Sequence, residues 1–219
     1  MKVDIWSDVR CPFCYIGKRK FEMALEKFAH KDEIEVEWHS FELDPGTVTD
    51  PAANVYDHLA EKKGQTREWA VQMHEHVVKT AAEVGLHFNF DQSVIANSFN
   101  AHRLIQLAKS EGLDNQLEEL LFIAHFIDGK NIDDQATLLE IGIAAGLNSV
   151  AVENLLNSAE FTNEVRADQQ IAQQIGISGV PFFIFDQKLA VSGAQAPETF
   201  LGAMEQAWSK SAAEVLPAR

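Results

Sequence analysis

Apolar and polar residues alternate in two short segments near the start of the chain. Both Val3 to Ser7 and Ile34 to His39 follow a period of two, which is typical of a strand with one buried face. Between them, the apolar residues from Tyr15 to Ala29 can share one face of a helix. Pro12 suits the first position of that helix, where a missing N–H has no cost. The pattern therefore predicts strand, helix, strand, the opening of a βαβ unit.

From residue 51 to residue 176 the period becomes helical almost throughout. Several predicted helices end on a glycine followed by an apolar residue, an arrangement in which glycine takes the left-handed conformation past the last turn. These pairs are Gly85-Leu86, Gly112-Leu113, Gly146-Leu147 and Gly176-Ile177. Asp114 and one of Asp133 or Asp134 stand where an N-cap is expected.

After Gly176 the period of two returns. The segments 180–185 and 189–192 predict two strands joined as a hairpin, and a final amphipathic helix is expected from Pro197 to Trp208. The order β-α-β, then α-β-β-α, predicts an α/β fold with a thioredoxin-like core. We expect that core to comprise residues 1–50 and 177–210, with an all-helical domain of residues 51–176 inserted after the second strand. The last helix of the insertion is expected to pack on the core.

Composition and charge narrow the possible functions. The chain has 219 residues, of which 46% are hydrophobic, so it can bury a sizeable core. Its net charge of −15 disfavours binding to nucleic acid or to anionic lipid. No apolar run reaches the roughly 18 residues of a membrane span, and Lys2 and Asp4 interrupt any signal-peptide pattern. We therefore expect a cytoplasmic protein that engages neither nucleic acid nor membrane.

The chain contains only two cysteines, Cys11 and Cys14, at the predicted start of the first helix. Residues three apart share a face of the helix, so the pair lies within the roughly 4.4–6.8 Å that a disulfide requires between Cα atoms. The helix N-terminus favours a negative sulfur at Cys11. We therefore predict that Cys11 is the nucleophile and that Cys14, one turn deeper, resolves the mixed disulfide.

A zinc site is the competing interpretation of the cysteine pair. Tetrahedral zinc would need two histidines in addition to the two cysteines. His30 and His39 are too far apart in sequence for a finger, and His74 and His76 project to different sides of a helix. The sequence therefore predicts no metal site.

The dipeptide Val180-Pro181 begins a predicted strand, where proline is tolerated. In a thioredoxin-type core this loop faces the turn that holds Cys11. A cis bond there would leave the Val180 backbone free to pair with an extended peptide as an added strand. Val180 and Pro181 are therefore predicted to bind substrate.

Three segments resemble the DsbA-like thioredoxin family, in its FrnE branch. They read SDVRCPFCYIG at 7–17, NSFNAHRL at 97–104 and GISGVPFF at 176–183. The resemblance covers essentially the whole chain and implies a disulfide oxidoreductase with Cys11 as nucleophile, Cys14 as resolving thiol and Pro181 in cis. It implies no bound cofactor beyond the redox-active Cys11–Cys14 pair. Phe13 departs from the histidine of periplasmic DsbA proteins, so we expect a less oxidising couple.

The resemblance leaves a second activity open. 2-Hydroxychromene-2-carboxylate isomerases and kappa-class glutathione transferases share the fold and activate glutathione with a single serine or similar residue at the position of Cys11. A dithiol is unnecessary for that reaction, so Cys14 favours exchange on protein or peptide disulfides, with glutathione as a further possible partner. A non-catalytic peptide-binding module would leave both cysteines unexplained. The sequence does not determine the oligomeric state, the substrate or the direction of electron flow.

Other residues near these motifs have two interpretations each. Asp8 is more simply explained as a carboxylate that stabilises the turn near the helix N-terminus than as a group that transfers protons. His102 is more simply explained as a hydrogen-bonded histidine that packs inside the protein than as a residue of the active site. Phe13 lies between the two cysteines and is expected to be exposed and to contact substrate.

Overall fold

The computed structural model describes the backbone of residues 1–215 and the side chains of residues 1–210. Its strands are β1 (Lys2–Ser7), β2 (Glu35–Ser40), β3 (Phe182–Phe185) and β4 (Leu189–Ser192). Its α-helices are α1 (Pro12–Leu25), α2 (Val55–Lys63), α3 (Arg67–Ala82), α4 (Phe99–Ser110), α5 (Asp114–Phe126), α6 (Gln135–Ala144), α7 (Ser149–Leu156), α8 (Thr162–Gln174) and α9 (Pro197–Val215). Short 3₁₀ turns are η1 (Lys31–Glu33) and η2 (Phe90–Gln92).

The strands form one sheet in the order β2-β1-β3-β4. β1 runs parallel to β2, as the predicted βαβ opening requires, and antiparallel to β3. The hairpin of β3 and β4 is antiparallel and also agrees with the prediction. In this register Ile5 lies opposite Trp38 on one side and Phe183 on the other.

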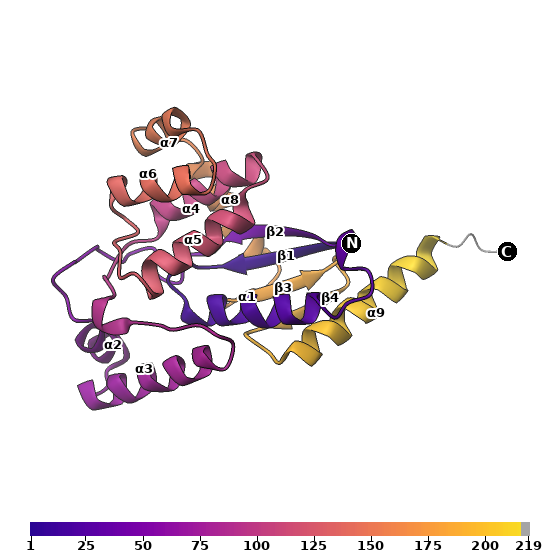
Figure 1. Ribbon diagram of the computed structural model, residues 1–219, viewed down its shortest axis with the longest axis horizontal. Coiled ribbons are helices and arrows are strands. Elements are labelled where there is room, and N and C mark those ends of the chain that lie inside the picture. Colours follow the sequence, from indigo (N-terminus) through magenta and orange to yellow (C-terminus); the bar gives the residue numbers. More distant parts are fainter. Residues whose placement is uncertain (216–219) are drawn as a thin grey trace.

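The two faces of the sheet are covered by different helices. Val3 and Ile5 on β1 point toward the buried cluster that includes residues of α1 and α9, and Figure 1 shows these two helices running alongside the sheet. On the other face Trp6 packs against Ala172 of α8. Its indole Nε1 donates to the Asp168 carbonyl at 3.2 Å. The last of the central helices therefore lies against the sheet.

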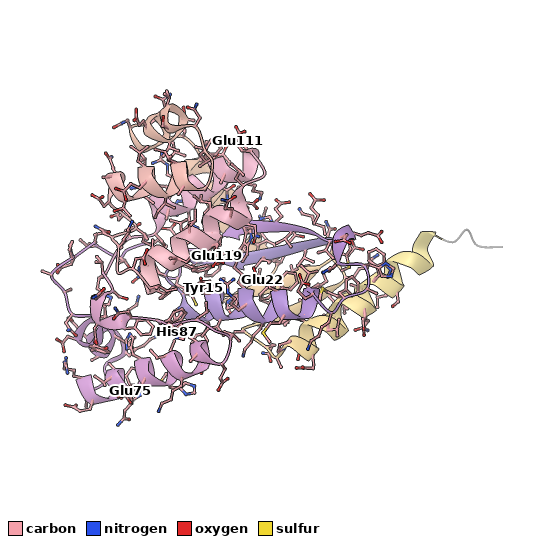
Figure 2. The ribbon with its side chains drawn as sticks, in the orientation of Figure 1. Tyr15, Glu22, Glu75, His87, Glu111 and Glu119 are labelled. Carbon is pink, nitrogen blue, oxygen red and sulfur yellow. The ribbon has the colours of Figure 1, made fainter. Side chains whose placement is uncertain are left out.

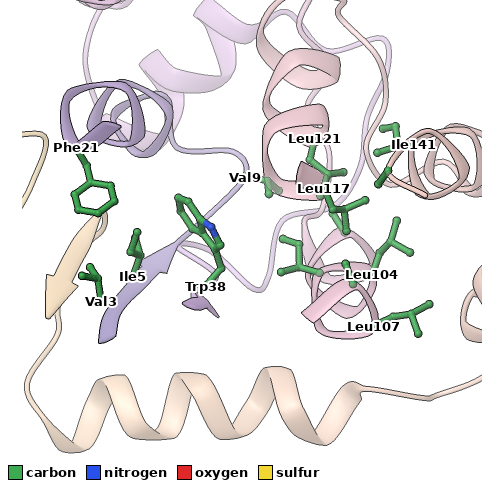
Figure 3. Close-up of a cluster of buried hydrophobic side chains, with 14 of the residues drawn as sticks. Val3, Ile5, Val9, Phe21, Trp38, Leu104, Leu107, Leu117, Leu121 and Ile141 are labelled. Carbon is green, nitrogen blue, oxygen red and sulfur yellow. The ribbon is translucent and has the colours of Figure 1, made fainter. Parts of the chain in front are cut away.

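The largest buried cluster runs from the sheet into the helical part of the chain (Figure 3). Ile5 and Trp38 belong to the same cluster as Leu104, Leu117 and Ile141 from α4, α5 and α6. Burial of each such side chain contributes roughly 1.5–3 kcal/mol. The helices α4 to α6 are thus fixed relative to the strands that carry the cysteine turn. The division into a core and an inserted domain stays a prediction.

Several predicted boundaries differ from the structure. α1 ends at Leu25 rather than near Ala29, because the N–H groups of Lys27 and Phe28 bond three residues back and tighten the last turn. Asp114 is the first residue of α5 instead of its N-cap, and its carboxylate accepts from the Trp38 N–H at 3.4 Å. Asp134 does cap α6.

The C-terminal helix is longer than predicted, and the predicted helix-ending glycines have the expected backbone conformation. α9 continues to Val215, past the predicted end at Trp208. The glycines that were predicted to end helices all have positive φ, at residues 85, 112, 146 and 176. In the described part of the chain, no helix combines the length and the apolar character needed to cross a bilayer.

Candidate active site

Cys11 and Cys14 lie at the start of α1, as predicted. Cys11 is the N-cap residue with extended backbone angles, and Pro12 follows in the first turn. The Cys14 N–H donates to the Cys11 carbonyl at 2.9 Å, which closes the turn around the pair. Both are free thiols; Cys11 is 5% exposed and Cys14 is 1% exposed. Both thiols are therefore buried, and Cys11 is the more accessible of the two.

The Val180–Pro181 loop lies directly against Cys11. The peptide bond between these two residues is cis, as the resemblance implied. The Cys11 thiol is 3.6 Å from the Val180 carbonyl oxygen, within reach of a weak S–H hydrogen bond. Gly17 allows the close approach of α1 to this loop, because a Cβ there would lie 2.8 Å from Cγ of Pro181.

The environments of the two thiols differ. Burial raises the pKa of the Cys14 thiol well above its ordinary value, and contact with the Cys11 thiol raises it further. The Ser7 hydroxyl and the Asp8 backbone favour the Cys14 thiolate, but less strongly. Cys14 therefore stays protonated at neutral pH until a proton acceptor or a reaction step removes the proton.

Sequence reasoning missed a buried carboxylic acid behind Cys14. Glu118 of α5 is 1% exposed, and its Oε1 accepts a hydrogen bond from the Ser7 hydroxyl at 2.7 Å. Burial raises the pKa of Glu118 to about 7, although Ser7 and the nearby His102 charge oppose that rise. No local pattern identifies this residue, since α5 is far from the cysteines in sequence.

Asp8 and His102 form a buried pair beside the cysteine turn. The Asp8 carboxylate accepts the N–H groups of Arg10 at 3.0 Å and Leu43 at 2.8 Å, as the interpretation of a turn carboxylate predicts. His102 Nε2 lies 3.6 Å from Asp8 Oδ1, too far for a hydrogen bond but close enough for a charge interaction. Burial disfavours both charges. The His102 charge nevertheless lowers the pKa of Asp8 to about 2, and Asp8 raises the pKa of His102.

A second set of contacts, with α5, fixes α1 in addition to its contact with the Val180 loop. The Tyr15 ring stacks on Phe122 of α5 with centroids 4.7 Å apart. Its hydroxyl donates to Glu119 Oε1 at 2.6 Å, and Figure 2 shows both residues between the two helices. Lys18 and Arg19 also pair with Glu119. The helix that carries the cysteines is therefore held by α5 as well as by the sheet.

A cavity of about 370 Å³ opens beside Cys11. Phe13 lines it and is 38% exposed, which confirms the predicted exposure of this residue. Arg10 and His125 line it as well, and sequence reasoning found neither. Burial and, to a smaller extent, the Arg10 charge together lower the pKa of His125 to about 4. The imidazole of His125 is therefore neutral at physiological pH.

Within the described residues, metal-ligand spacing occurs at Asp4, Glu37 and His39, on the strands and away from the cysteines. Lys2 pairs with both carboxylates there, and Lys109 also pairs with Glu37. Amino groups thus already satisfy the acidic oxygens of this cluster.

Comparisons with known proteins agree with this geometry. The crystal structure of a probable DsbA oxidoreductase from Streptomyces coelicolor is 38% identical. It covers 100% of this chain and 93% of its own, with a TM-score of 0.90. The protein YwbO of Bacillus subtilis (strain 168) is 26% identical over 203 residues, which span 90% of this chain and 92% of YwbO.

A third protein, similar in fold, is an enzyme with the second candidate activity. A 2-hydroxychromene-2-carboxylate isomerase structure is 14% identical, covers 99% of this chain and 100% of its own, and has a TM-score of 0.69. At that identity the likeness shows the fold alone.

The family model described as the DSBA-like thioredoxin domain matches residues 2–205. This chain, with its cysteine turn at the start of α1 and its four-stranded sheet, belongs to the DSBA-like thioredoxin domain family.

Proposed function

We propose that this protein is a thiol–disulfide oxidoreductase that acts on protein or peptide disulfides through Cys11 and Cys14. The observation that carries the proposal is the placement of the two thiols. Cys11 caps the N-terminus of α1 against the Val180 carbonyl, and Cys14 lies buried one turn deeper. The N-terminus of a helix attracts negative charge, whereas burial keeps the Cys14 thiol protonated.

The proposed reaction is two successive exchanges. The Cys11 thiolate attacks one sulfur of a substrate disulfide, forms a mixed disulfide and releases the other substrate sulfur as a thiolate. Cys14 then loses its proton and attacks the Cys11 sulfur. The Cys11–Cys14 disulfide forms, and the second substrate sulfur leaves and takes up a proton. Two electrons pass from the protein to the substrate, and the reverse sequence oxidises a substrate dithiol.

Substrate binding is proposed at the loop that faces Cys11. The backbone of Val180 and Pro181 lies beside the attacking sulfur, which supports pairing with an extended peptide. Phe13, which separates the cysteines in the sequence together with Pro12, lines the cavity beside Cys11 and is accessible to a bound chain. We propose the cytoplasm as the compartment, because two cysteines placed for exchange leave none for a structural disulfide.

Two cysteine variants test the proposal. Cys11→Ser is expected to abolish insulin reduction, whereas Cys14→Ser is expected to retain the first exchange and accumulate a mixed disulfide with substrate, detectable by mass spectrometry. Met23→Ala is the control, since Met23 lies on α1 but is 44% exposed. Equal effects of the two cysteine variants would contradict the assigned roles.

A glutathione-dependent isomerase or transferase is the second candidate, and the cavity beside Cys11 is the observation that favours it. Such a reaction would use one thiol and would survive Cys14→Ser. Thiol–disulfide turnover would not survive that change. Measuring both activities on the same Cys14→Ser protein separates the two candidates.

A further inference from the structure

The segment 97–104 contributes no side chain to the proposed exchange reaction, although it is one of the three segments that resemble the DsbA-like family. It leads into α4, which begins at Phe99 and carries His102 in its first turns. His102 is 1% exposed, and neither of its ring nitrogens has a hydrogen-bond partner among the described residues. Buried polar atoms in native proteins nearly always have such a partner. The charge of His102 is therefore the property through which it can act.

The end of β1 brings His102 close to the buried acid Glu118. Ser7 is the last residue of β1, and Asp8 follows it directly. The Ser7 hydroxyl donates to Glu118 Oε1 at 2.7 Å, and Asp8 Oδ1 lies 3.6 Å from His102 Nε2. One side chain from α4 and one from α5 thus approach two consecutive residues, just before the cysteine turn.

Three carboxyl groups favour the charged form of His102. Burial disfavours that charge, but the carboxyl groups outweigh burial and raise the pKa of His102 above its ordinary 6.5. Asp8 contributes most, followed by Glu118 and Glu42. All three carboxyl groups are buried as well. At pH 6.5 more than half of the His102 side chains are therefore charged.

The charge of His102 acts in turn on Glu118. Burial raises the pKa of Glu118, and the Ser7 hydrogen bond is the strongest influence against that rise. The His102 charge comes next, ahead of the Lys18 charge, whereas the Asp8 charge adds to the rise more weakly. Among the charged groups that face Glu118, His102 therefore has the largest effect, and it favours the carboxylate.

We propose that His102 is a positioning residue for the second exchange. Its charge favours the ionised form of Glu118, and this carboxylate takes the Cys14 proton through the Ser7 hydroxyl. The inference rests on the proposed exchange function and concerns the regulation of the same site. The Cys14 proton passes to Ser7 Oγ while the Ser7 hydroxyl proton passes to Glu118 Oε1. The Cys14 thiolate then attacks the Cys11 sulfur, and the substrate sulfur leaves as a thiolate.

The chromogenic disulfide dithiobis(nitrobenzoate) separates the two exchanges. One equivalent is mixed with the reduced protein, and the Cys11 thiolate attacks it and releases a first coloured thiolate. Cys14 then attacks the Cys11 sulfur of the mixed disulfide and releases the second. Stopped-flow absorbance therefore records the two steps as two phases. The Cys14→Ser protein releases only the first thiolate and so identifies the first phase.

The pH profile of the second phase tests the role of His102. In the unmodified protein its rate is expected to rise with pH around a midpoint near 7, because Glu118 must be ionised. His102→Gln removes the charge, so Glu118 is expected to ionise about one pH unit higher. At pH 6.5 the second phase should then slow about fivefold or more, whereas at pH 9 it should change less than about twofold. The first phase should change less than about twofold at both pH values.

The control for this pH profile is His76→Gln, because His76 is exposed on α3. It is expected to leave both phases and the midpoint unchanged. A second phase that His102→Gln slows by the same factor at both pH values, or leaves unchanged at pH 6.5, would overturn the inference.

A double substitution shows whether His102 acts through Glu118. Glu118→Gln removes the proton acceptor, so the second phase should slow and lose its midpoint near 7. Adding His102→Gln to this protein should change the rate less than about twofold. An equal slowing by His102→Gln with and without the Glu118 carboxyl would contradict the proposed path.

An NMR titration of the His102 imidazole tests the same interaction without any change at His102. Because the attraction between two charged groups is mutual, Glu118→Gln should lower the pH at which His102 loses its proton. If that pH does not change, the two side chains do not interact and the inference is wrong.

Insulin reduction separates this inference from the proposed function. If insulin is reduced while the second phase keeps its midpoint in His102→Gln, the positioning role is wrong and the exchange function stands. If the second phase depends on His102 as expected but insulin is not reduced, activity on protein disulfides is wrong and the positioning role stands.

Discussion

At the level of single residues, Cys11 and Cys14 share a helical turn but have different neighbours. The sulfur of Cys11 faces the Val180 carbonyl, whereas Cys14 is surrounded by protein and is backed by Ser7. The Ser7 hydroxyl in turn donates to Glu118. The Ser7 hydroxyl thus links the Cys14 thiol to the Glu118 carboxyl group, whose pKa is about 7. Cys14 must lose its proton before it can attack the mixed disulfide.

The titration of Glu118 makes stability depend on pH. Its pKa is about 7 in the folded protein and 4.5 ordinarily, so the folded state holds a proton that the unfolded state has lost between those values. The contribution of Glu118 to stability therefore falls as pH rises through this window and is constant above it. We predict that between pH 4.5 and 8 the protein loses about 3 kcal/mol relative to Glu118→Gln. Urea denaturation at both pH values measures the difference.

Glu111→Gln is the control for this prediction, because Glu111 is exposed at the end of α4 (Figure 2). Its difference from the unmodified protein should be the same at both pH values. A Glu118→Gln difference that is equally independent of pH would show that folding does not raise the pKa of the Glu118 carboxyl.

At the level of elements, α1 is the helix whose position decides the geometry of the site. It packs against α9, is held by α5 through Tyr15 and Glu119, and approaches the Val180–Pro181 loop at Gly17. A Cβ at Gly17 would lie 2.8 Å from Pro181 Cγ and 3.5 Å from Phe183 Cζ. α1 must shift away from the loop to accept it, and the contact between Cys11 and Val180 would lengthen with it.

A matched pair of alanine substitutions tests this packing. Gly17→Ala is expected to lower stability by about 1–2 kcal/mol, because the added methyl overpacks the contact with Pro181. Disulfide exchange should slow with it. Gly202→Ala in α9 is the control, since a methyl group there would meet no described atom within 4 Å apart from its own helix. There the substitution should raise stability by roughly 0.5–1 kcal/mol. If Gly17→Ala were as stabilising as Gly202→Ala, the contact with Pro181 would not constrain α1.

The elements that sequence reasoning predicted best are those with strong local signals. The strand periods, Pro12 at the helix start, the helix-ending glycines and the order of elements all have local causes, and the structure confirms them. The position of Asp114 was wrong because a tertiary contact with the Trp38 N–H decides it. Glu118 and His125 were missed for the same reason, since only the packing of α5 against α1 brings them to the cysteines. Membership of the FrnE branch stays a prediction.

At the level of the whole molecule, one buried polar network joins the sheet to the helices. His39 on β2 lies between Asp168 of α8, with Nδ1 and Oδ1 2.9 Å apart, and Asp4 of β1, with Nε2 and Oδ1 2.8 Å apart. Asp168 Oδ2 also accepts from the Ser40 N–H at 2.8 Å and from Gln106 of α4 at 2.6 Å. The Asp168 carboxylate therefore connects α8 with β2 and α4, and through His39 also with β1.

The charge on His39 sets the pH range over which this network stabilises the fold. Burial opposes that charge, but Asp168 and Asp4 outweigh burial and the Lys109 charge and raise the pKa of His39 above its ordinary 6.5. A raised histidine pKa gives stability that is fully present below the ordinary value and is lost as pH rises through the folded value.

We predict that Asp168→Asn loses about 2–3 kcal/mol of stability at pH 5.5, where it removes a charged partner of a buried cation. At pH 9 the loss should be smaller, because the share of His39 side chains that carry a charge falls as pH rises. Urea denaturation at the two pH values measures both losses, with Glu75→Gln on the exposed side of α3 as the control. Equal losses of Asp168→Asn at both pH values would mean that Asp168 joins the sheet to α8 and α4 through uncharged hydrogen bonds alone, and that the charge of His39 contributes nothing to holding the helices on the sheet.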